Sequence, residues 1–169
     1  ENWKREAQEV EALMGLILEF FASEIDELDE KNVCIRILGD KDGLPQRQRD
    51  VLYDAEERTG QNTGLKLNIA INYGGRAEIV RASQALAKKA LAGEIKPEEI
   101  DEAMLAREMY TKDLPDVDLL IRTSGEMRLS NFLLWQCSYA EFVFPTVLWP
   151  DFDLKQYHAC IDEFHGRQR

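Results

Sequence analysis

One stretch in the second half of the chain is rich in side chains that bind anions. Arg122, Arg128 and Ser130 lie within nine residues of each other. Guanidinium groups bind phosphate oxygens through paired hydrogen bonds, and hydroxyl and free N–H groups at the start of a helix add donors to such a site. This pattern indicates a diphosphate pocket. A loop with two solvated arginines, one paired with Glu126 and one with Asp118, explains it equally well.

One carboxylate farther along the chain could hold a metal ion. Glu141 opens a short apolar run, 142–144. A carboxylate is costly to bury unless it is paired or binds a cation, and Mg²⁺ is usually held by one or two carboxylates together with substrate phosphates. Glu141 is therefore a candidate Mg²⁺ ligand. From its local context alone, an exposed first residue of a strand is the stronger interpretation.

Two further segments carry polar residues next to turns or helix starts. Asn2, Trp3 and Arg5 form a polar, aromatic and basic cluster ahead of a long amphipathic segment. They could form a substrate loop or only a solvated helix entry. The segment 72–76, N-Y-G-G-R, is similar to a phosphate-binding turn, but it has neither dinucleotide-binding nor Walker spacing. We interpret it as a tight turn.

These residues must be positioned by alternating helices and strands. Apolar periodicity and breaker residues predict six helices, at 6–28, 45–58, 76–91, 97–109, 127–137 and 155–164. The same signals predict four strands, at 32–38, 65–73, 117–121 and 141–144. This alternation predicts an α/β fold with a mostly parallel sheet flanked by helices on both faces. Ligands then bind beyond the carboxyl ends of the strands, which points to the turns at Gly39, 72–76 and 122–130.

Composition limits the class of protein. The chain has 169 residues, 44% of them hydrophobic and 31% charged, and a net charge of −11. Its length suits one domain, and its acidity argues against nucleic acid as a partner and against attraction to anionic lipids. No apolar run is long enough to span a membrane. Three cysteines without a C-x-x-C motif favour neither a disulfide framework nor a zinc site, and suit a reducing cytoplasm.

Several of these segments together resemble one known family. The run 118–136, D-L-L-I-R-T-S-G-E-M-R-L-S-N-F-L-L-W-Q, with Y-A-E at 139–141 and L-W-P-D-F at 148–152, closely resembles the signature of the cis-prenyltransferases. The bacterial undecaprenyl diphosphate synthases are the most similar members. Residues 67–76 match a second block of that family, and residues 1–5 match the end of a third. The resemblance covers essentially the whole chain in one register.

The resemblance implies a fold, an activity and partners. The fold would be the α/β cis-prenyltransferase fold with a mostly parallel central sheet. The activity would be condensation of isopentenyl diphosphate onto an allylic diphosphate, with farnesyl diphosphate expected, in cis geometry. The product would be an undecaprenyl-type diphosphate carrier for cell-wall synthesis. The family forms homodimers through the region 141–152, and we expect a cytoplasmic protein with at most peripheral contact with the inner face of the membrane.

The resemblance also assigns roles to residues. Arg122, Arg128 and Ser130 would grip the isopentenyl diphosphate, and Glu141 would help to place Mg²⁺, in its own or a neighbouring subunit's site. The mobile loop ahead of the first helix would supply Asn2 as a catalytic residue, and Trp3 and Arg5 as substrate-binding residues. Glu9 would be a carboxylate next to that loop. The apolar faces of 10–21 and 65–71 would line a tunnel for the growing hydrocarbon.

One motif of the family does not occur in this chain. It is Asp-Gly-Asn-Gly-Arg-Trp, whose aspartate is the central catalytic and Mg²⁺-placing residue. We therefore expect residues 1–169 to be a single α/β domain, incomplete at the N-terminus and slightly at the C-terminus, and inactive alone although the whole protein is an enzyme. The alternative is a non-catalytic partner subunit of a heteromeric cis-prenyltransferase. The intact set of candidate site residues favours the enzyme.

Overall fold

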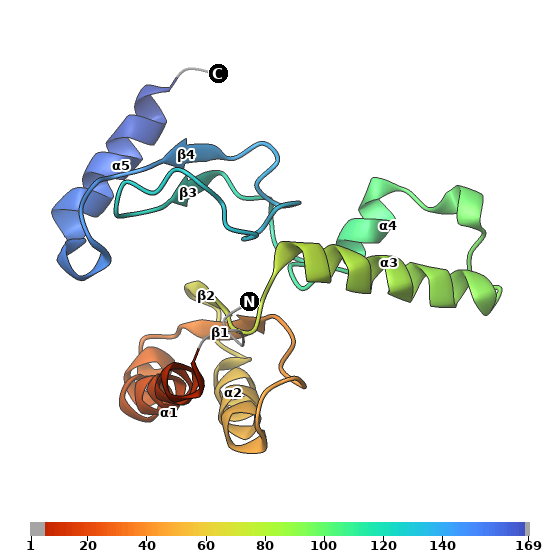
Figure 1. The fold of residues 1–169 in the computed structure, drawn as a ribbon, viewed down its shortest axis with the longest axis horizontal. Helices are drawn as coiled ribbons and strands as arrows, with labels where there is room; N and C mark the ends of the chain where they lie inside the picture. Colours follow the sequence, from red (N-terminus) through yellow and green to blue (C-terminus); the bar gives the residue numbers. More distant parts are fainter. Residues whose placement is uncertain (1–5, 168–169) are drawn as a thin grey trace. The chain divides into compact units, whose positions relative to one another are not determined.

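The structure is a computed structural model that describes residues 6–167. The chain divides into two compact units, Glu1–Gly74 and Gly75–Arg169, which we call the first and the second unit. Each unit combines helices with one pair of parallel strands (Figure 1). The α/β class and the parallel pairing predicted from the alternation of elements are therefore confirmed.

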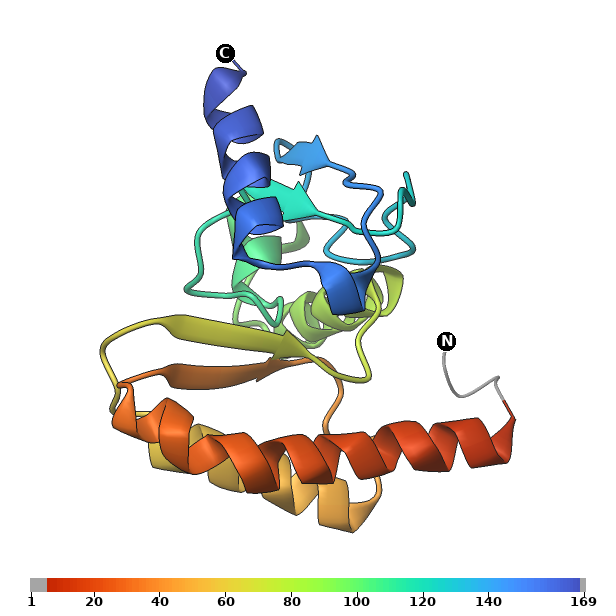
Figure 2. The same ribbon diagram turned by 90° about the vertical axis from the view of Figure 1, so that its left-hand side faces the viewer.

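The first unit contains four elements that agree closely with the sequence pattern. They are α1 (Ala7–Glu30), β1 (Cys34–Leu38), α2 (Gln46–Thr59) and β2 (Lys66–Ala70). Strand β1 pairs with β2 in parallel, with Cys34 opposite Lys66 and Leu38 opposite Ala70. Both helices lie on the same side of this strand pair (Figure 2). The apolar stripes of α1 and α2 therefore share one core with one face of β1.

That core explains why these segments form these elements. Alternate residues of β1 point to one face, and two of them, Ile35 and Ile37, are buried. They join apolar residues that recur at helical spacing on α1 and α2, and the cluster consists of Phe21, Ile25, Val33, Ile35, Ile37, Leu44, Leu52 and Ala55. Side chains of α2 also satisfy backbone donors of β1. Thr59 Oγ1 accepts a hydrogen bond from Ile35 N at 3.0 Å, and Glu56 Oε1 accepts one from Ile37 N at 2.7 Å.

The turns that follow β1 and β2 are joined, as expected for parallel neighbours. Asp40 N donates to the Asn72 carbonyl at 3.2 Å, and Asn72 Nδ2 donates to the Asp40 carbonyl at 2.8 Å. Gly39 has a φ of +131°, and a Cβ there would lie 2.1 Å from the Ile71 carbonyl oxygen. Only glycine allows the two backbones to approach this closely.

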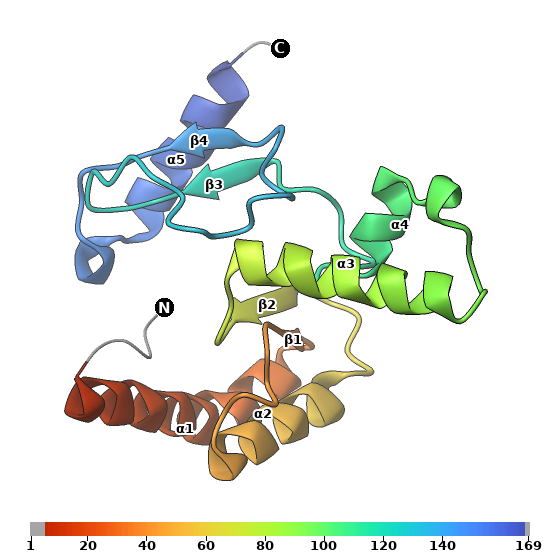
Figure 3. The same ribbon diagram turned by 45° about the vertical axis from the view of Figure 1, so that its right-hand side comes forward.

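The second unit has shorter elements and longer connections. Figure 3 shows α3 beside α4, and α5 beside the β3–β4 pair. The elements are α3 (Gly75–Leu91), η2 (Pro97–Glu99), α4 (Glu102–Arg107), β3 (Leu119–Ile121), β4 (Glu141–Val143), η3 (Trp149–Asp151) and α5 (Leu154–Gly166). Strands β3 and β4 are parallel, with Leu119 opposite Glu141 and Ile121 opposite Val143. Because its strands have only three residues, this unit consists mainly of helices and irregular connections.

Two predicted helices of the second unit differ from the structure. The helix predicted at 97–109 is broken into η2 and α4, because Asp101 is extended and its side chain caps α4 by accepting from Met104 N at 2.7 Å. The helix predicted at 127–137 is wrong, because that segment is a series of turns. Ser130, Asn131 and Leu133 have φ values of +47°, +64° and +42°, which no α-helix accommodates.

Two properties of the described residues bear on the protein's environment. None of the helices within residues 6–167 is long and apolar enough to cross a membrane. All three cysteines carry free thiols. Cys137 and Cys160, both in the second unit, are buried, whereas Cys34 on β1 is half-buried. Burial raises the pKa of the Cys137 and Cys160 thiols.

Candidate anion-binding site

The candidate site begins where β3 ends. Arg122 N donates to the Val143 carbonyl at 3.0 Å, which extends the strand pairing by one residue. The chain then turns through Ser124 and Gly125, whose φ values are +67° and +64°. The backbone N–H groups of these two residues donate to carbonyls in the segment after β4, at 2.8 Å and 2.9 Å. The main chain around Arg122 is thus fixed from both sides.

The structure brings Arg122, Arg128 and Ser130 together on this loop. Arg122 Nη1 donates to Ser130 Oγ at 3.0 Å and also to the Arg128 carbonyl. The Arg128 guanidinium forms an ion pair with Glu126 and is 63% exposed. The ion pair expected for a loop of solvated arginines thus forms at Arg128, while Arg122 is held by the loop itself.

This arrangement suits an anionic ligand. The Ser130 hydroxyl and the Arg128 carbonyl, which accept from Arg122, are neutral, so neither cancels its positive charge. The Arg128–Glu126 pair is largely exposed, and exposed pairs contribute only about 0.2–1 kcal/mol. A phosphate group, which accepts stronger charge-assisted hydrogen bonds, can therefore displace the Glu126 carboxylate. The loop thus holds one guanidinium group, of Arg122, against the Ser130 hydroxyl, and carries a second, exposed guanidinium group on Arg128.

A helix N-terminus does contact this loop, but it belongs to α3. Gly75 N donates to the Asn131 carbonyl at 2.7 Å, and Arg76 N donates to Asn131 Oδ1 at 2.9 Å. A Cβ on Gly75 would lie 2.9 Å from Leu134 Cγ, so glycine is needed where the loop packs on the helix. The prediction that free N–H groups at the start of a helix at 127–137 add donors to the anion site is therefore wrong, because that helix is absent. The first N–H groups of α3 do not replace them, because they donate to Asn131.

A buried polar cluster, which sequence reasoning missed, joins α3 to the end of the segment that follows this loop. Glu78 on α3 is 1% exposed and accepts hydrogen bonds from Tyr110 N at 2.7 Å and from Gln136 Nε2 at 3.1 Å. Gln136 Nε2 also donates to Thr111 Oγ1 at 2.8 Å. Nearby, the Arg81 guanidinium lies 4.1 Å from the centre of the Tyr110 ring. The signal in the sequence that could have indicated this cluster is Glu78, a carboxylate at helical spacing from the buried residues Ala82 and Leu86 of α3.

Glu141 lies at the other end of the strand pair. It is opposite Leu119, the first residue of β3, whereas Arg122 follows the last residue of β3. Three residues of strand span roughly 10 Å, so this chain does not bring Glu141 to its own arginine loop. Its carboxylate accepts from Arg167 Nη1 at 2.9 Å. The hydrogen bonds that Arg167 donates to Glu141 and, to a lesser extent, to Glu163 raise the pKa of its guanidinium group.

The described residues contain few candidates for metal ligands. No group of three or more His, Cys, Asp or Glu residues within 6–167 could hold a metal ion. Glu141 therefore fits Mg²⁺ only as a single carboxylate that needs further oxygen ligands, such as those of a diphosphate. Asn2, Trp3 and Arg5 lie outside the described residues. Glu9 is an exposed residue in the first turn of α1.

Comparisons with known proteins agree on one family. A model of that family, described as putative undecaprenyl diphosphate synthase, matches residues 1–169. An isoprenyl transferase from Streptococcus thermophilus is 50% identical over 173 residues, which cover 100% of this chain and 70% of the relative. An isoprenyl transferase from Bacillus subtilis is 48% identical and a ditrans,polycis-undecaprenyl-diphosphate synthase from Vibrio cholerae is 46% identical. Each match covers 100% of this chain, and 65% and 68% of those two relatives.

Solved structures give the same result for the fold. Lavandulyl diphosphate synthase from Lavandula x intermedia, in complex with dimethylallyl diphosphate, matches with a TM-score of 0.95 at 36% identity, over 99% of this chain and 73% of that one. A probable undecaprenyl diphosphate synthase from Campylobacter jejuni matches with a TM-score of 0.86 at 36% identity, over 99% of this chain and 76% of that one. The chain therefore belongs to the undecaprenyl diphosphate synthase family of prenyltransferases, which are transferase enzymes.

Proposed function

We propose that the complete protein condenses isopentenyl diphosphate onto an allylic diphosphate with cis geometry, and that its primer is farnesyl diphosphate. The product is an undecaprenyl-type diphosphate carrier for cell-wall synthesis. The observation that carries the proposal is the loop in which Arg122 is bonded to Ser130 beside an exposed Arg128. The proposal is also supported by the Vibrio cholerae relative, whose name specifies (2E,6E)-farnesyl diphosphate.

In this proposal the loop binds the diphosphate of the homoallylic substrate. Arg122 and Arg128 donate to its oxygens, and Ser130 donates its hydroxyl hydrogen while it continues to accept from Arg122. Because the main chain at Arg122 is fixed to β4 and to the segment after it, and Arg122 bonds to Ser130, these two donors are in place before the substrate arrives, whereas Arg128 must first release Glu126. Preorganised donors stabilise charge without reorganisation cost. Holding the diphosphate at one end orients the isopentenyl double bond for attack on the allylic carbon.

The proposed Mg²⁺ ligand is Glu141, acting on a neighbouring subunit. Mg²⁺ would neutralise diphosphate charge when bound. Glu141 lies at the end of the strand pair away from Arg122, so its carboxylate suits a site other than that of its own chain. A homodimer through 141–152 would allow this. The proposal of a dimer is supported by the exposure of Leu148 and Trp149, at 58% and 72%.

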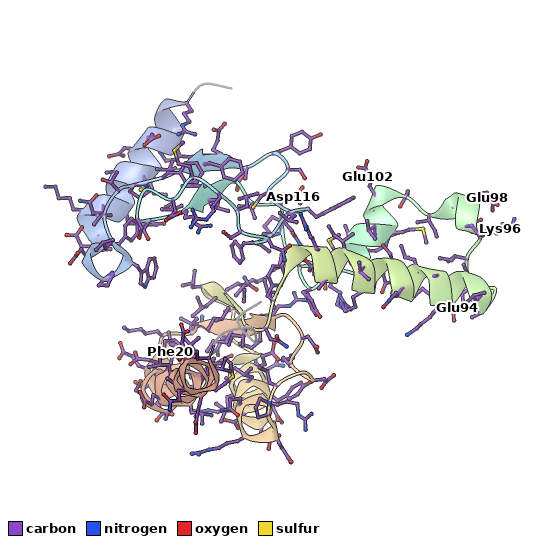
Figure 4. The ribbon with its side chains drawn as sticks, in the orientation of Figure 1. Phe20, Glu94, Lys96, Glu98, Glu102 and Asp116 are labelled. Carbon is purple, nitrogen blue, oxygen red and sulfur yellow. The ribbon has the colours of Figure 1, made fainter. Side chains whose placement is uncertain are left out.

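The apolar product needs a surface on the protein. Leu16 and Phe20 on α1 are 57% and 40% exposed, and Figure 4 labels Phe20 on that helix. We propose that these side chains, on the helix that follows the substrate loop, contact the growing hydrocarbon. Each buried CH₂ group contributes about 0.8 kcal/mol, so the extent of this apolar surface would influence product length.

The test uses the protein expressed from its complete reading frame. It is incubated with farnesyl diphosphate, labelled isopentenyl diphosphate and Mg²⁺, and the chain length of the product is measured. We expect a long-chain polyprenyl diphosphate, and loss of affinity for isopentenyl diphosphate in Arg128→Ala. Absence of incorporation by the folded protein would contradict the proposal, and full affinity in Arg128→Ala would contradict the role of that residue.

Three further expectations remain predictions. Residues 1–169 alone should be inactive in the same assay, which also tests whether they form one incomplete domain. Labelled protein in fractionated cells should be found in the cytoplasm. The structure of residues 6–167 gives no support to the expected peripheral contact with the membrane.

A further inference from the structure

The segment 131–136 is attached to α3 at both of its ends. At one end, the Asn131 carbonyl and side-chain oxygen accept from Gly75 N and Arg76 N at 2.7 Å and 2.9 Å. At the other end, Gln136 Nε2 donates to the buried Glu78 carboxylate at 3.1 Å. Gly75 and Glu78 lie on the same side of the first turn of α3, because residues three apart are neighbours on a helix. The first turn of α3 is therefore the support of this segment.

Asn131 is suited to this position in two ways. Its φ is +64°, a region in which asparagine is one of the few favourable residues other than glycine. Its side-chain oxygen also satisfies a helix N–H that has no partner within the helix. Glycine would retain the backbone conformation but lose the hydrogen bond to Arg76 N. The two contributions of Asn131 can thus be separated by one substitution.

The residue before Asn131 belongs to the candidate site, the loop 122–130, which we call the anion-binding loop. Ser130 has a φ of +47°, and its hydroxyl accepts from Arg122 Nη1 at 3.0 Å. A shift of Asn131 relative to α3 moves Ser130 directly, and it moves the acceptor that orients the Arg122 guanidinium. One peptide unit therefore connects the capping residue Asn131 to the Ser130 hydroxyl, and one further hydrogen bond connects it to the Arg122 guanidinium.

We propose that Asn131 is a positioning residue for the diphosphate site: by capping α3 it holds the Ser130 hydroxyl and the Arg122 guanidinium in the geometry that binds the homoallylic diphosphate. This inference rests on the proposed function for the identity of the ligand. The N-terminus of α3 then acts as a support for the loop rather than as an anion site of its own, because Asn131 occupies its first two donors.

The test compares Asn131→Gly with Asp101→Gly in the full-length protein. Both substitutions remove a side-chain oxygen that accepts a backbone N–H at the start of a helix, α3 in one variant and α4 in the other. Asp101 contacts no residue of the anion-binding loop through its cap. Any effect that comes only from loss of a helix cap should therefore appear in both variants.

We expect Asn131→Gly to raise the KM for isopentenyl diphosphate about tenfold, the scale of one lost hydrogen bond, with kcat and the KM for the allylic substrate within about twofold. Asp101→Gly should lower the Tm comparably and leave all three kinetic parameters near wild type. An unchanged KM for isopentenyl diphosphate in Asn131→Gly, or an equal rise in Asp101→Gly, would overturn the inference.

Amide hydrogen exchange of residues 122–130 separates this inference from the proposed function. We expect faster exchange there in Asn131→Gly than in wild type and Asp101→Gly, with no substrate present. If wild-type protein incorporates no isopentenyl diphosphate, the proposed function fails and the exchange measurement still decides the positioning role. Unchanged exchange in Asn131→Gly would refute that role whatever the activity.

Discussion

The two units of the chain are stabilised in different ways. The first unit has five-residue strands and a core of apolar side chains from α1, β1 and α2. The second has three-residue strands, and its buried residues include Glu78 and Gln136, which bond to each other. The residues of the anion-binding loop lie in the less regular unit. The comparison indicates that substitutions in the apolar core of the first unit change stability alone, whereas those around the loop also change ligand binding.

The largest expected effect is on the core of the first unit. Leu52 is fully buried, and Leu52→Ala should lower the free energy of unfolding by about 2–5 kcal/mol through lost burial and a cavity. Urea denaturation measures this loss, and the KM for isopentenyl diphosphate should not change. Glu57→Ala, at an exposed position of the same helix, serves as the control and should stay within about 0.5 kcal/mol of wild type. A raised KM in Leu52→Ala would break the contrast between the units.

Next in size is the buried carboxylate of the second unit. Glu78→Leu removes the acceptor of Tyr110 N and one of the acceptors of Gln136 Nε2, which keeps its hydrogen bond to Thr111 Oγ1, and each unsatisfied buried donor costs about 1–3 kcal/mol. We expect a loss of about 2–3 kcal/mol in urea denaturation, together with a higher KM for isopentenyl diphosphate. Glu78→Gln retains an acceptor for Tyr110 N and should lose less. Equal stability of Glu78→Leu and wild type would show that the cluster does not support the unit.

A smaller effect, confined to binding, is expected at the loop itself. Arg122→Lys keeps the charge but loses the planar guanidinium group, whose Nη1 donates to both Ser130 Oγ and the Arg128 carbonyl. The KM for isopentenyl diphosphate should rise about tenfold, while stability stays within about 0.5 kcal/mol. Steady-state kinetics and urea denaturation measure the two quantities. Arg107→Lys, on exposed α4, is the matched control. A stability loss without a change in KM would reverse the expected pattern.

The smallest effect is expected from an exposed ion pair of the first unit. Lys31 lowers the pKa of Glu27 through a hydrogen bond and its charge. A carboxylate with a depressed folded-state pKa stabilises the fold above its unfolded pKa, and this contribution is lost as the pH falls through the folded pKa. Glu27→Gln should therefore be slightly less stable than wild type at neutral pH and equally stable in acid. High salt should also remove the difference, because both side chains are exposed. A difference that persists in acid would exclude the ion pair as its cause.

The same contrast explains which features were predictable from the sequence. The helix predicted at 6–28 agrees with α1, Ala7–Glu30. Its apolar residues recur at helical spacing because they pack into one core, so the sequence alone contains the signal. The segment 127–137 is predicted as a helix, but in the structure it is a series of turns. Its true conformation depends on hydrogen bonds between Asn131 and α3, which are distant in sequence and leave no local periodic signal.

The candidate site shows a similar division. The grouping of Arg122, Arg128 and Ser130 followed from their spacing in one turn after a strand. The separation of Glu141 from Arg122 was implicit in the same prediction, because Glu141 opens its strand whereas Arg122 follows the end of the neighbouring one. The Glu78–Gln136 hydrogen bond joins residues on different elements, and its only trace in the sequence is one carboxylate within an apolar stripe.

The distribution of the three thiols gives the protein its own chemical reporters. Cys137 and Cys160 of the second unit are each 3% exposed, and burial raises the pKa of both thiols. An alkylating reagent reacts with thiolates, so labelling of these two residues at neutral pH requires that the second unit first opens. Cys34 on β1 is half-buried, so its labelling does not require the first unit to open. Peptide mapping of labelled wild-type protein therefore follows the opening of the second unit, with Cys34 as an internal reference and without any introduced probe.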